Sequence, residues 1–184
     1  MSLGLTTQNG LLLKNLMEFY NRNGNMERIL PIINGEASIS LRLIDWFATN
    51  YSKKNYTVYN LKDNGMDKRF KVYIDYKLKL KAYSKKRFDP FCRWERINIP
   101  YKNETYIQTT IGQLNFFRWA LENKILDYIE NNLISITNDM NKRNSTAKNR
   151  KEKINHTRKK REELSVSASK SIKKEKVEII VDFR

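Results

Sequence analysis

The stretch that most constrains this chain is residues 69–86, RFKVYIDYKLKLKAYSKK, in which apolar and charged residues alternate. Every second position from Phe70 to Ala82 is apolar, and lysine occupies most of the positions between them. Side chains leave a β-strand alternately to its two faces, so strict alternation over this length predicts a strand over residues 70–82. One face of this strand would join a hydrophobic core. The other would carry Lys71, Tyr73, Asp75, Lys77, Lys79 and Lys81.

Three helices are predicted elsewhere in the chain, because apolar residues recur at helical spacing. They cover residues 11–22, 38–51 and 110–140. Ser38 or Ser40 can cap the second helix, and Thr110 with Gln113 forms a capping box for the third. A break in the third helix is expected near residues 131–132.

Short strands surround the long one. Asp63, Asn64 and Gly65 predict a hairpin loop between a strand at residues 56–61 and the long strand. Two further short strands are expected at 96–99 and 106–109. The expected fold class is therefore α+β: a small, mainly antiparallel sheet packed by three or more helices, with a basic arm.

The distribution of apolar residues indicates how the chain is divided into a folded domain and appended segments. Residues 1–10 are interpreted as a flexible leader, and residues 11–184 as a single α+β domain. Residues 142–161 are almost devoid of apolar side chains and are expected to form a basic arm. Alternating apolar residues at 164–168 and 177–183 predict strands that return to the sheet, so the arm would be tethered at both ends.

The net charge is +16, and the excess is confined to two blocks. Residues 53–102 carry a net charge of +10 and residues 142–161 a net charge of +9, whereas the remaining segments are neutral or slightly acidic. Such an excess predicts attraction to nucleic acid or to an anionic surface. No apolar run approaches the length of a membrane span, so membrane insertion is not expected.

Lysine and arginine side chains of both blocks are therefore the candidate nucleic-acid contacts, largely independent of sequence because they would meet phosphates. On the strand, Tyr73 could stack on a base, but the same lysines would also protect an edge strand from aggregation. The alternative for the arm is a solvated, solubilising loop. The candidate residues are Lys71, Lys77, Lys79, Lys81, Lys148, Arg150, Lys151, Lys153, Arg158, Lys159, Lys160 and Arg161.

A metal-dependent nuclease is the catalytic alternative. A carboxylate before the hairpin, Asp63 or Asp67, followed by Asp75 and Lys77 on one strand face could hold Mg²⁺ and orient water. The pattern uses common residues, and we favour the interpretation that Asp75 pairs with a neighbouring strand lysine. We assign no catalytic residue, metal ligand or cofactor.

Cysteine and histidine occur once each. Cys92 and His156 cannot build a disulfide framework or a Cys/His zinc site, which favours a reducing, intracellular compartment. Cys92 is interpreted as a small packing residue, and His156 as an exposed residue of the arm.

Four stretches together resemble an uncharacterised protein family of the nucleocytoplasmic large DNA viruses, the giant viruses. They are SLRLIDWFATNY (40–51), FDPFCR (88–93), TTIGQLNFFRWALEN (109–123) and RKKREELSVSASKSI (158–172) with the closing VEIIVDF. The resemblance implies a viral protein acting in a virus factory, host nucleus or virion, and it carries no catalytic residues with it.

In that setting we expect a nucleic-acid-binding protein, for DNA or RNA, in late transcription or genome packaging. The alternative is a virion or scaffold protein whose basic surfaces meet acidic viral proteins. The sequence leaves the oligomeric state open.

Overall fold

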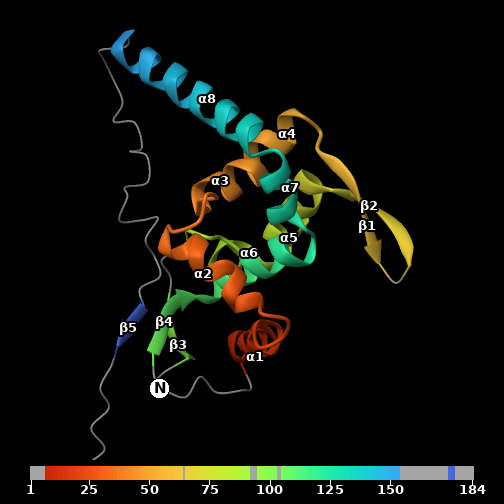
Figure 1. The fold of residues 1–184 in the computed structure, drawn as a ribbon, viewed down its shortest axis with the longest axis vertical. Helices are drawn as coiled ribbons and strands as arrows, with labels where there is room; N and C mark the ends of the chain where they lie inside the picture. The colour runs from red at the N-terminus through yellow and green to blue at the C-terminus, as the bar shows by residue number, and fades with distance from the viewer. Residues whose placement is uncertain (1–6, 64, 92–94, 103–104, 154–173, 177–184) are drawn as a thin grey trace, which may run out of the picture.

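The computed structural model describes residues 7–63, 65–91, 95–102, 105–153 and 174–176. Its helices gather around one central helix, α6 (Ile111–Glu122), as Figure 1 shows. A two-stranded hairpin projects from one side of this body, and a three-stranded sheet lies on another side. The expected α+β class is confirmed, but the helices do not cover one central sheet.

Helix α6 is central because its sequence is apolar on nearly every side. Ten of its twelve residues are buried, and the exceptions are Arg118 and Glu122. Its start is fixed by Thr110, whose Oγ1 accepts a hydrogen bond from the backbone N–H of Gln113 at 3.2 Å. The predicted cap at Thr110 is therefore confirmed.

The predicted N-terminal helix is confirmed as α1 (Gln8–Tyr20), which packs against α6. It begins earlier than expected, because Thr7 caps it by accepting a hydrogen bond from the N–H of Gly10 at 3.1 Å. The last residues of the expected leader thus belong to a helix. Tyr20 anchors the other end of α1, since its hydroxyl donates to the carbonyl of Leu114 at 2.5 Å.

The next segments are also helical. Helix α2 (Asn25–Asn34) ends at Gly35, which adopts the left-handed conformation with φ of 75°. The helix predicted over residues 38–51 begins at Leu41 and is capped by Ser40. It consists of α3 (Leu41–Trp46), the π-helical turn η1 (Phe47–Tyr51) and the short α4 (Ser52–Lys54).

The strand predicted over residues 70–82 is wrong beyond its first two residues. The hairpin forms as expected from β1 (Val58–Asp63) and β2 (Met66–Lys71), but the chain then turns directly into helix α5 (Val72–Arg87). Leu, Lys and Ala dominate the second half of the stretch and favour helix over strand. Val72, Tyr76, Leu80 and Tyr83 recur at helical spacing and face the core.

The second sheet has the order β3-β4-β5, with both pairs antiparallel. Strands β3 (Arg96–Tyr101) and β4 (Thr105–Thr110) confirm the two short strands predicted there. Strand β5 (Lys174–Lys176) pairs with β4, so the chain does return to the sheet. The strands predicted over 164–168 and 177–183 lie outside the described residues.

The helix predicted over residues 110–140 is divided into three. Lys124, with φ of 52°, separates α6 from α7 (Ile125–Asn131), and Asn132 separates α7 from α8 (Leu133–Lys153). Helix α8 continues into the expected arm, whose first half is therefore helical. Among the described residues, no helix has the length and apolar character needed to cross a membrane.

Candidate nucleic-acid interface

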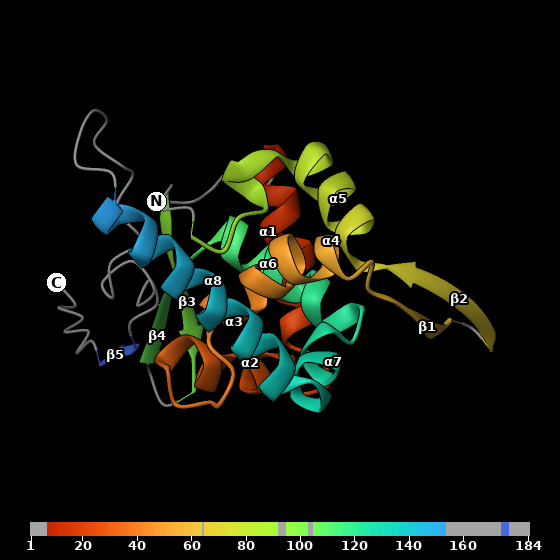
Figure 2. The same cartoon turned by 90° about the horizontal axis from the view of Figure 1, so that it is seen from above.

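The β1–β2 hairpin projects away from the helical body (Figures 1 and 2). An isolated two-stranded hairpin is barely stable in water, so its base must be anchored. The hydroxyl of Tyr59 donates to the carbonyl of Asn123 at 2.6 Å, and its ring stacks on Tyr128 with centroids 5.1 Å apart. Leu61 and Phe70 on the same face are buried.

The opposite face of the hairpin is cationic. Directly paired residues point to the same side of an antiparallel ladder, so the pairs Val58–Lys71, Asn60–Arg69 and Lys62–Asp67 share one face. Lys62, Arg69 and Lys71, which we call the hairpin cations, are exposed. In the part of the chain that the structure describes, none of the three forms an ion pair.

Of the hairpin cations, Lys71 was predicted as a contact and the other two were missed. The sequence predicts a hairpin loop over residues 63–65, and the register of such a hairpin would have placed Lys62 and Arg69 on the same face as Lys71. Two large side chains near the hairpin are also strongly exposed: Met66 next to the turn, at 73%, and Tyr56 before β1, at 86%.

The lysines of α5 do not form the predicted ladder. In a helix each residue is rotated about 100° from the one before, so Lys77 and Lys81 lie on one side and Lys79 about 200° away from Lys77. Lys77 and Lys81 are exposed, whereas Lys79 is half-buried. The expectation that Lys71, Lys77, Lys79 and Lys81 share one strand face is therefore wrong.

Tyr73, the expected stacking residue, lies on helix α5 rather than on a strand face. It lies half-buried at the start of α5, and the Nζ atom of Lys53 on α4 sits over its ring, 5.6 Å from the centroid. This cation–π contact joins α4 to α5 and adds Lys53 to the basic surface beside the hairpin.

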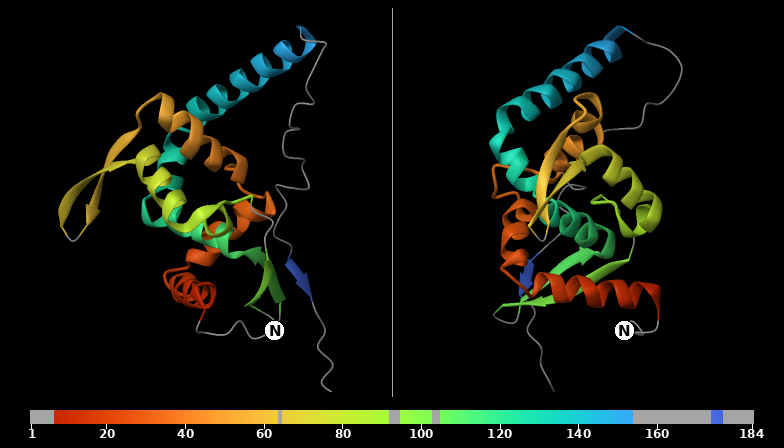
Figure 3. Two further views of the ribbon diagram at one scale, coloured as in Figure 1. Left: turned by 180° about the vertical axis from the view of Figure 1, so that it is seen from behind. Right: turned by 90° about the vertical axis from the view of Figure 1, so that its right-hand side faces the viewer.

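The basic arm leads away from the hairpin. Figures 1 to 3 show α8 leaving the body near α4 and running in a different direction from β1 and β2. Its first turns are held by Asp139, which accepts hydrogen bonds from Lys54 at 2.9 Å and from Trp46 at 3.2 Å. Burial works against ionisation of Asp139, but these hydrogen bonds and the charges of Lys54 and Arg143 outweigh it and lower its pKa.

The candidate contacts on the arm have no described side chains. Lys148, Arg150, Lys151 and Lys153 belong to the backbone of α8, while Arg158, Lys159, Lys160 and Arg161 lie outside the described residues, as do Cys92 and His156. The two basic blocks meet at the base of α8, where Lys54 and Arg143 both pair with Asp139, but α8 then leads away from the hairpin.

The shared strand face of Asp75 and Lys77, on which the nuclease alternative depended, does not form. Asp75 lies on helix α5, where Lys77 points to a different side, and its Oδ1 accepts a hydrogen bond from Nε1 of Trp119 at 2.6 Å. The bond fixes α5 to α6, so the predicted pairing of Asp75 with a strand lysine is also wrong. No cluster of Asp, Glu, His or Cys suited to a metal ion occurs in the described part of the chain.

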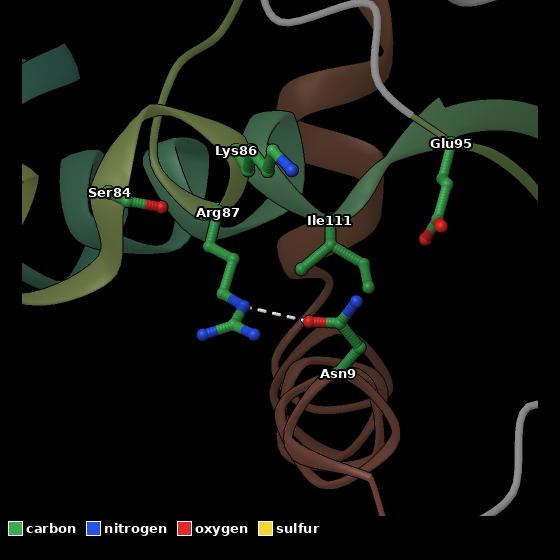
Figure 4. A pocket seen from close by; sticks show the side chains of 6 residues that line it. All are labelled: Asn9, Ser84, Lys86, Arg87, Glu95 and Ile111. Atoms are coloured by element: carbon green, nitrogen blue, oxygen red, sulfur yellow. Dashed lines mark hydrogen bonds between the residues drawn. The ribbon is translucent and has the colours of Figure 1, made fainter.

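The end of α5 is docked on the start of α6. Asn115 donates to the carbonyl of Arg87 at 2.9 Å, and Gly112 admits the backbone of Lys86 so closely that a Cβ atom would lie 2.9 Å from its carbonyl oxygen. Ser84 has a φ of 62°, which kinks the helix here. Beside the kink, Arg87 donates to Oδ1 of Asn9 at 2.7 Å across a polar hollow of about 380 Å³ (Figure 4).

The fold and this surface define a class: a largely helical α+β protein that projects a cationic hairpin. Comparison with known proteins identifies the particular family. The chain belongs to the family of unknown function DUF7197, whose model matches residues 5–183.

A similar curated protein is Uncharacterized protein L507 of Acanthamoeba polyphaga mimivirus, 49% identical over 132 residues that cover 69% of this chain and 50% of the relative. The chain thus spans about half the length of that relative. The resemblance to a giant-virus protein family is confirmed. No solved structure matches the chain.

Proposed function

We propose that the protein binds nucleic acid through phosphate contacts made by the hairpin cations, with Lys53, Lys77 and Lys81 beside them. The observation that carries the proposal is the projecting hairpin, whose outer face holds Lys62, Arg69 and Lys71 without ion-pair partners among the described residues. Residues 53–81 contain nine lysines and arginines but three aspartates. A projecting two-stranded ribbon also fits the width of a DNA major groove.

Binding of this kind is governed by charge. Each phosphate neutralised by a lysine or arginine releases counterions, so affinity falls steeply as salt rises. Contacts to phosphates carry no sequence information, and binding is therefore largely independent of sequence. The arm provides a second, separate contact. In a giant-virus setting this activity would serve genome packaging or late transcription in the virus factory, host nucleus or virion.

The test is a salt series with labelled duplex DNA, single-stranded DNA and RNA. We expect Arg69→Ala/Lys71→Ala to weaken binding and to lower the slope of log K against log salt by about 2, one unit for each phosphate that is no longer neutralised. Lys14→Ala/Arg22→Ala, with Lys14 on α1 and Arg22 just after it, removes the same charge from an exposed surface elsewhere and is the matched control.

Two results would contradict the proposal. One is the absence of salt-dependent binding to all three nucleic acids. The other is an equal loss of affinity in both double variants, which would mean that net charge rather than the hairpin attracts the ligand.

A further inference from the structure

The outer side of α5 displays two large aliphatic side chains that phosphate binding does not require. Ile74 is 52% exposed and Leu78 is 60% exposed, and they are neighbours because they lie four residues apart. The other side of the helix is fixed in the core by Val72 and Tyr76. Adjacent exposed aliphatic residues on a firmly held helix are typical of an interaction surface.

These residues line an open, mostly apolar hollow of about 490 Å³. Its lining forms two rows with spacing i, i+4, i+7. One row is Tyr73, Lys77 and Leu80, and the other is Ile74, Leu78 and Lys81. A groove between two such rows is the feature into which a ridge of side chains from another helix packs.

The charge of the groove restricts what can occupy it. Lys77 and Lys81 contribute cations, and no acidic residue is among its described lining residues. A second copy of the chain would bring the same lysines and a net charge of +16, so self-association here is opposed by repulsion. A partner that carries carboxylates beside apolar side chains can pair with the lysines and also cover Ile74 and Leu78.

We propose that α5 is a docking site for an acidic amphipathic helix of a partner protein. Residues 73–81 extend about 12 Å along α5, enough for two to three turns of the partner. Apolar residues of that helix cover Ile74 and Leu78, and flanking Asp or Glu residues reach Lys77 and Lys81. An anionic membrane would attract the same lysines, but a hollow between two rows fits a ridge of side chains better than a lipid surface.

The test uses the full chain and a fluorescent synthetic helical peptide with leucines along one face and glutamates on the others. A scrambled peptide of equal composition and a version with lysine in place of glutamate are the comparisons. We expect the acidic amphipathic peptide to bind with a Kd of roughly 10–100 µM, as befits a few apolar anchors. Ile74→Ser/Leu78→Ser should weaken it by about tenfold or more.

The matched control is Leu11→Ser/Ile134→Ser, which removes two exposed aliphatic residues from other helices and should change the affinity by less than about twofold. Both double variants should keep the wild-type Tm within a few degrees, because their side chains are exposed. The Ile74→Ser/Leu78→Ser variant should also retain salt-dependent nucleic-acid binding. That result separates this proposal from the proposed function.

Several outcomes would overturn the proposal. They are no binding of the acidic peptide, equal binding of the scrambled peptide, and an unchanged affinity in Ile74→Ser/Leu78→Ser. Tighter binding to phosphatidylserine vesicles that depends on Ile74 and Leu78 would assign the groove to a membrane instead. Dimerisation that this variant abolishes would assign it to a second copy.

Discussion

Asp45 on α3 has a largely buried carboxyl group, and Asp89 after α5 adds a second negative charge near it. Burial first, and then Asp89, raise the pKa of Asp45 from 3.8 to about 7. Burial also raises the pKa of the neighbouring Tyr76 phenol, and the charges of Asp45 and Asp89 raise it further. The folded protein therefore retains a proton on Asp45 at pH values where the unfolded chain has lost it.

This difference predicts a stability that depends on pH. Because the pKa of Asp45 is higher in the folded state, the free energy of unfolding falls as pH rises from about 4 to about 7. Asp45→Asn, which stays neutral, should match the wild type near pH 4 and be more stable by about 2–4 kcal/mol near pH 8. Urea denaturation at both pH values measures this.

The matched control is Asp127→Asn, which removes a carboxylate from an exposed ion pair with Arg28. It should change stability by less than about 1 kcal/mol at either pH. Equal pH dependence in Asp45→Asn and the wild type would show that Asp45 is ionised in the folded protein.

Gly112 permits a second prediction, in which two effects have opposite signs. Helix propensity alone predicts that Gly112→Ala stabilises α6 by about 1 kcal/mol. The added Cβ would meet the carbonyl oxygen of Lys86 at 2.9 Å and backbone atoms of Asp89 at 3.2 and 3.3 Å. We expect overpacking to dominate and to destabilise the fold by about 1–3 kcal/mol, as thermal unfolding would show.

At the scale of single residues, local chemistry was predictable and distant contacts were not. The cap at Thr110 was predictable because the hydroxyl of a capping residue accepts a hydrogen bond from the backbone N–H three residues later, here that of Gln113. The bond from Trp119 to Asp75 joins residues 44 positions apart. No local pattern indicates it, because it depends on how α5 packs on α6.

Among the secondary-structure elements, α5 shows most clearly how the strand and helix interpretations of residues 70–82 differ. As a strand, it would bury Tyr76 and Leu78 on the same face. As a helix, it buries Tyr76 among Phe88, Phe116 and Trp119, with ring centroids 5.8–6.4 Å away, and leaves Leu78 exposed. The strand and the helix therefore predict different losses of stability when Tyr76 and Leu78 are replaced.

We expect Tyr76→Ala to cost about 3 kcal/mol or more of unfolding free energy, since it empties a buried aromatic site. Leu78→Ala should cost less than about 1 kcal/mol because its side chain is mostly in solvent. Chemical denaturation of the two variants provides the comparison. Similar large losses in both would support the strand.

The alternation misled because it satisfies two periods at once. Val72, Tyr76 and Leu80 belong to the alternating apolar positions expected of a strand. Together with Tyr83 they also follow the spacing of one face of a helix. Tertiary packing decides between them, since α6 offers these residues an aromatic partner surface. The hairpin before α5 was predictable because its turn residues act locally.

For the whole molecule, the decisive feature is that the hairpin and α8 lead in different directions (Figure 3). Under the proposed function, two separated basic segments would bind a long polyanion at once but compete for a short one. The sequence could show that the charge falls in two blocks, but not whether folding brings them together.

This arrangement predicts a dependence on ligand length. On a duplex of about 40 base pairs, Arg69→Ala/Lys71→Ala and Lys148→Ala/Lys151→Ala should each reduce affinity strongly, because each removes one of two simultaneous contacts. On about 10 base pairs, roughly 34 Å, either surface alone suffices, so each double variant has a small effect and their combination a large one. Fluorescence anisotropy measures both series, and identical effects at both lengths would indicate one continuous site.

Lys71 is both the last residue of β2 and the residue that precedes the first turn of α5, with no loop between them. The N–H of Val72 donates to the carbonyl of Thr57 at 3.2 Å and closes the base of the hairpin at the same point. The hairpin and α5 are therefore connected directly, with no flexible linker between them. Because Asp75 on α5 accepts the hydrogen bond from the indole of Trp119, we expect a ligand that binds the hairpin to change the tryptophan fluorescence of the protein.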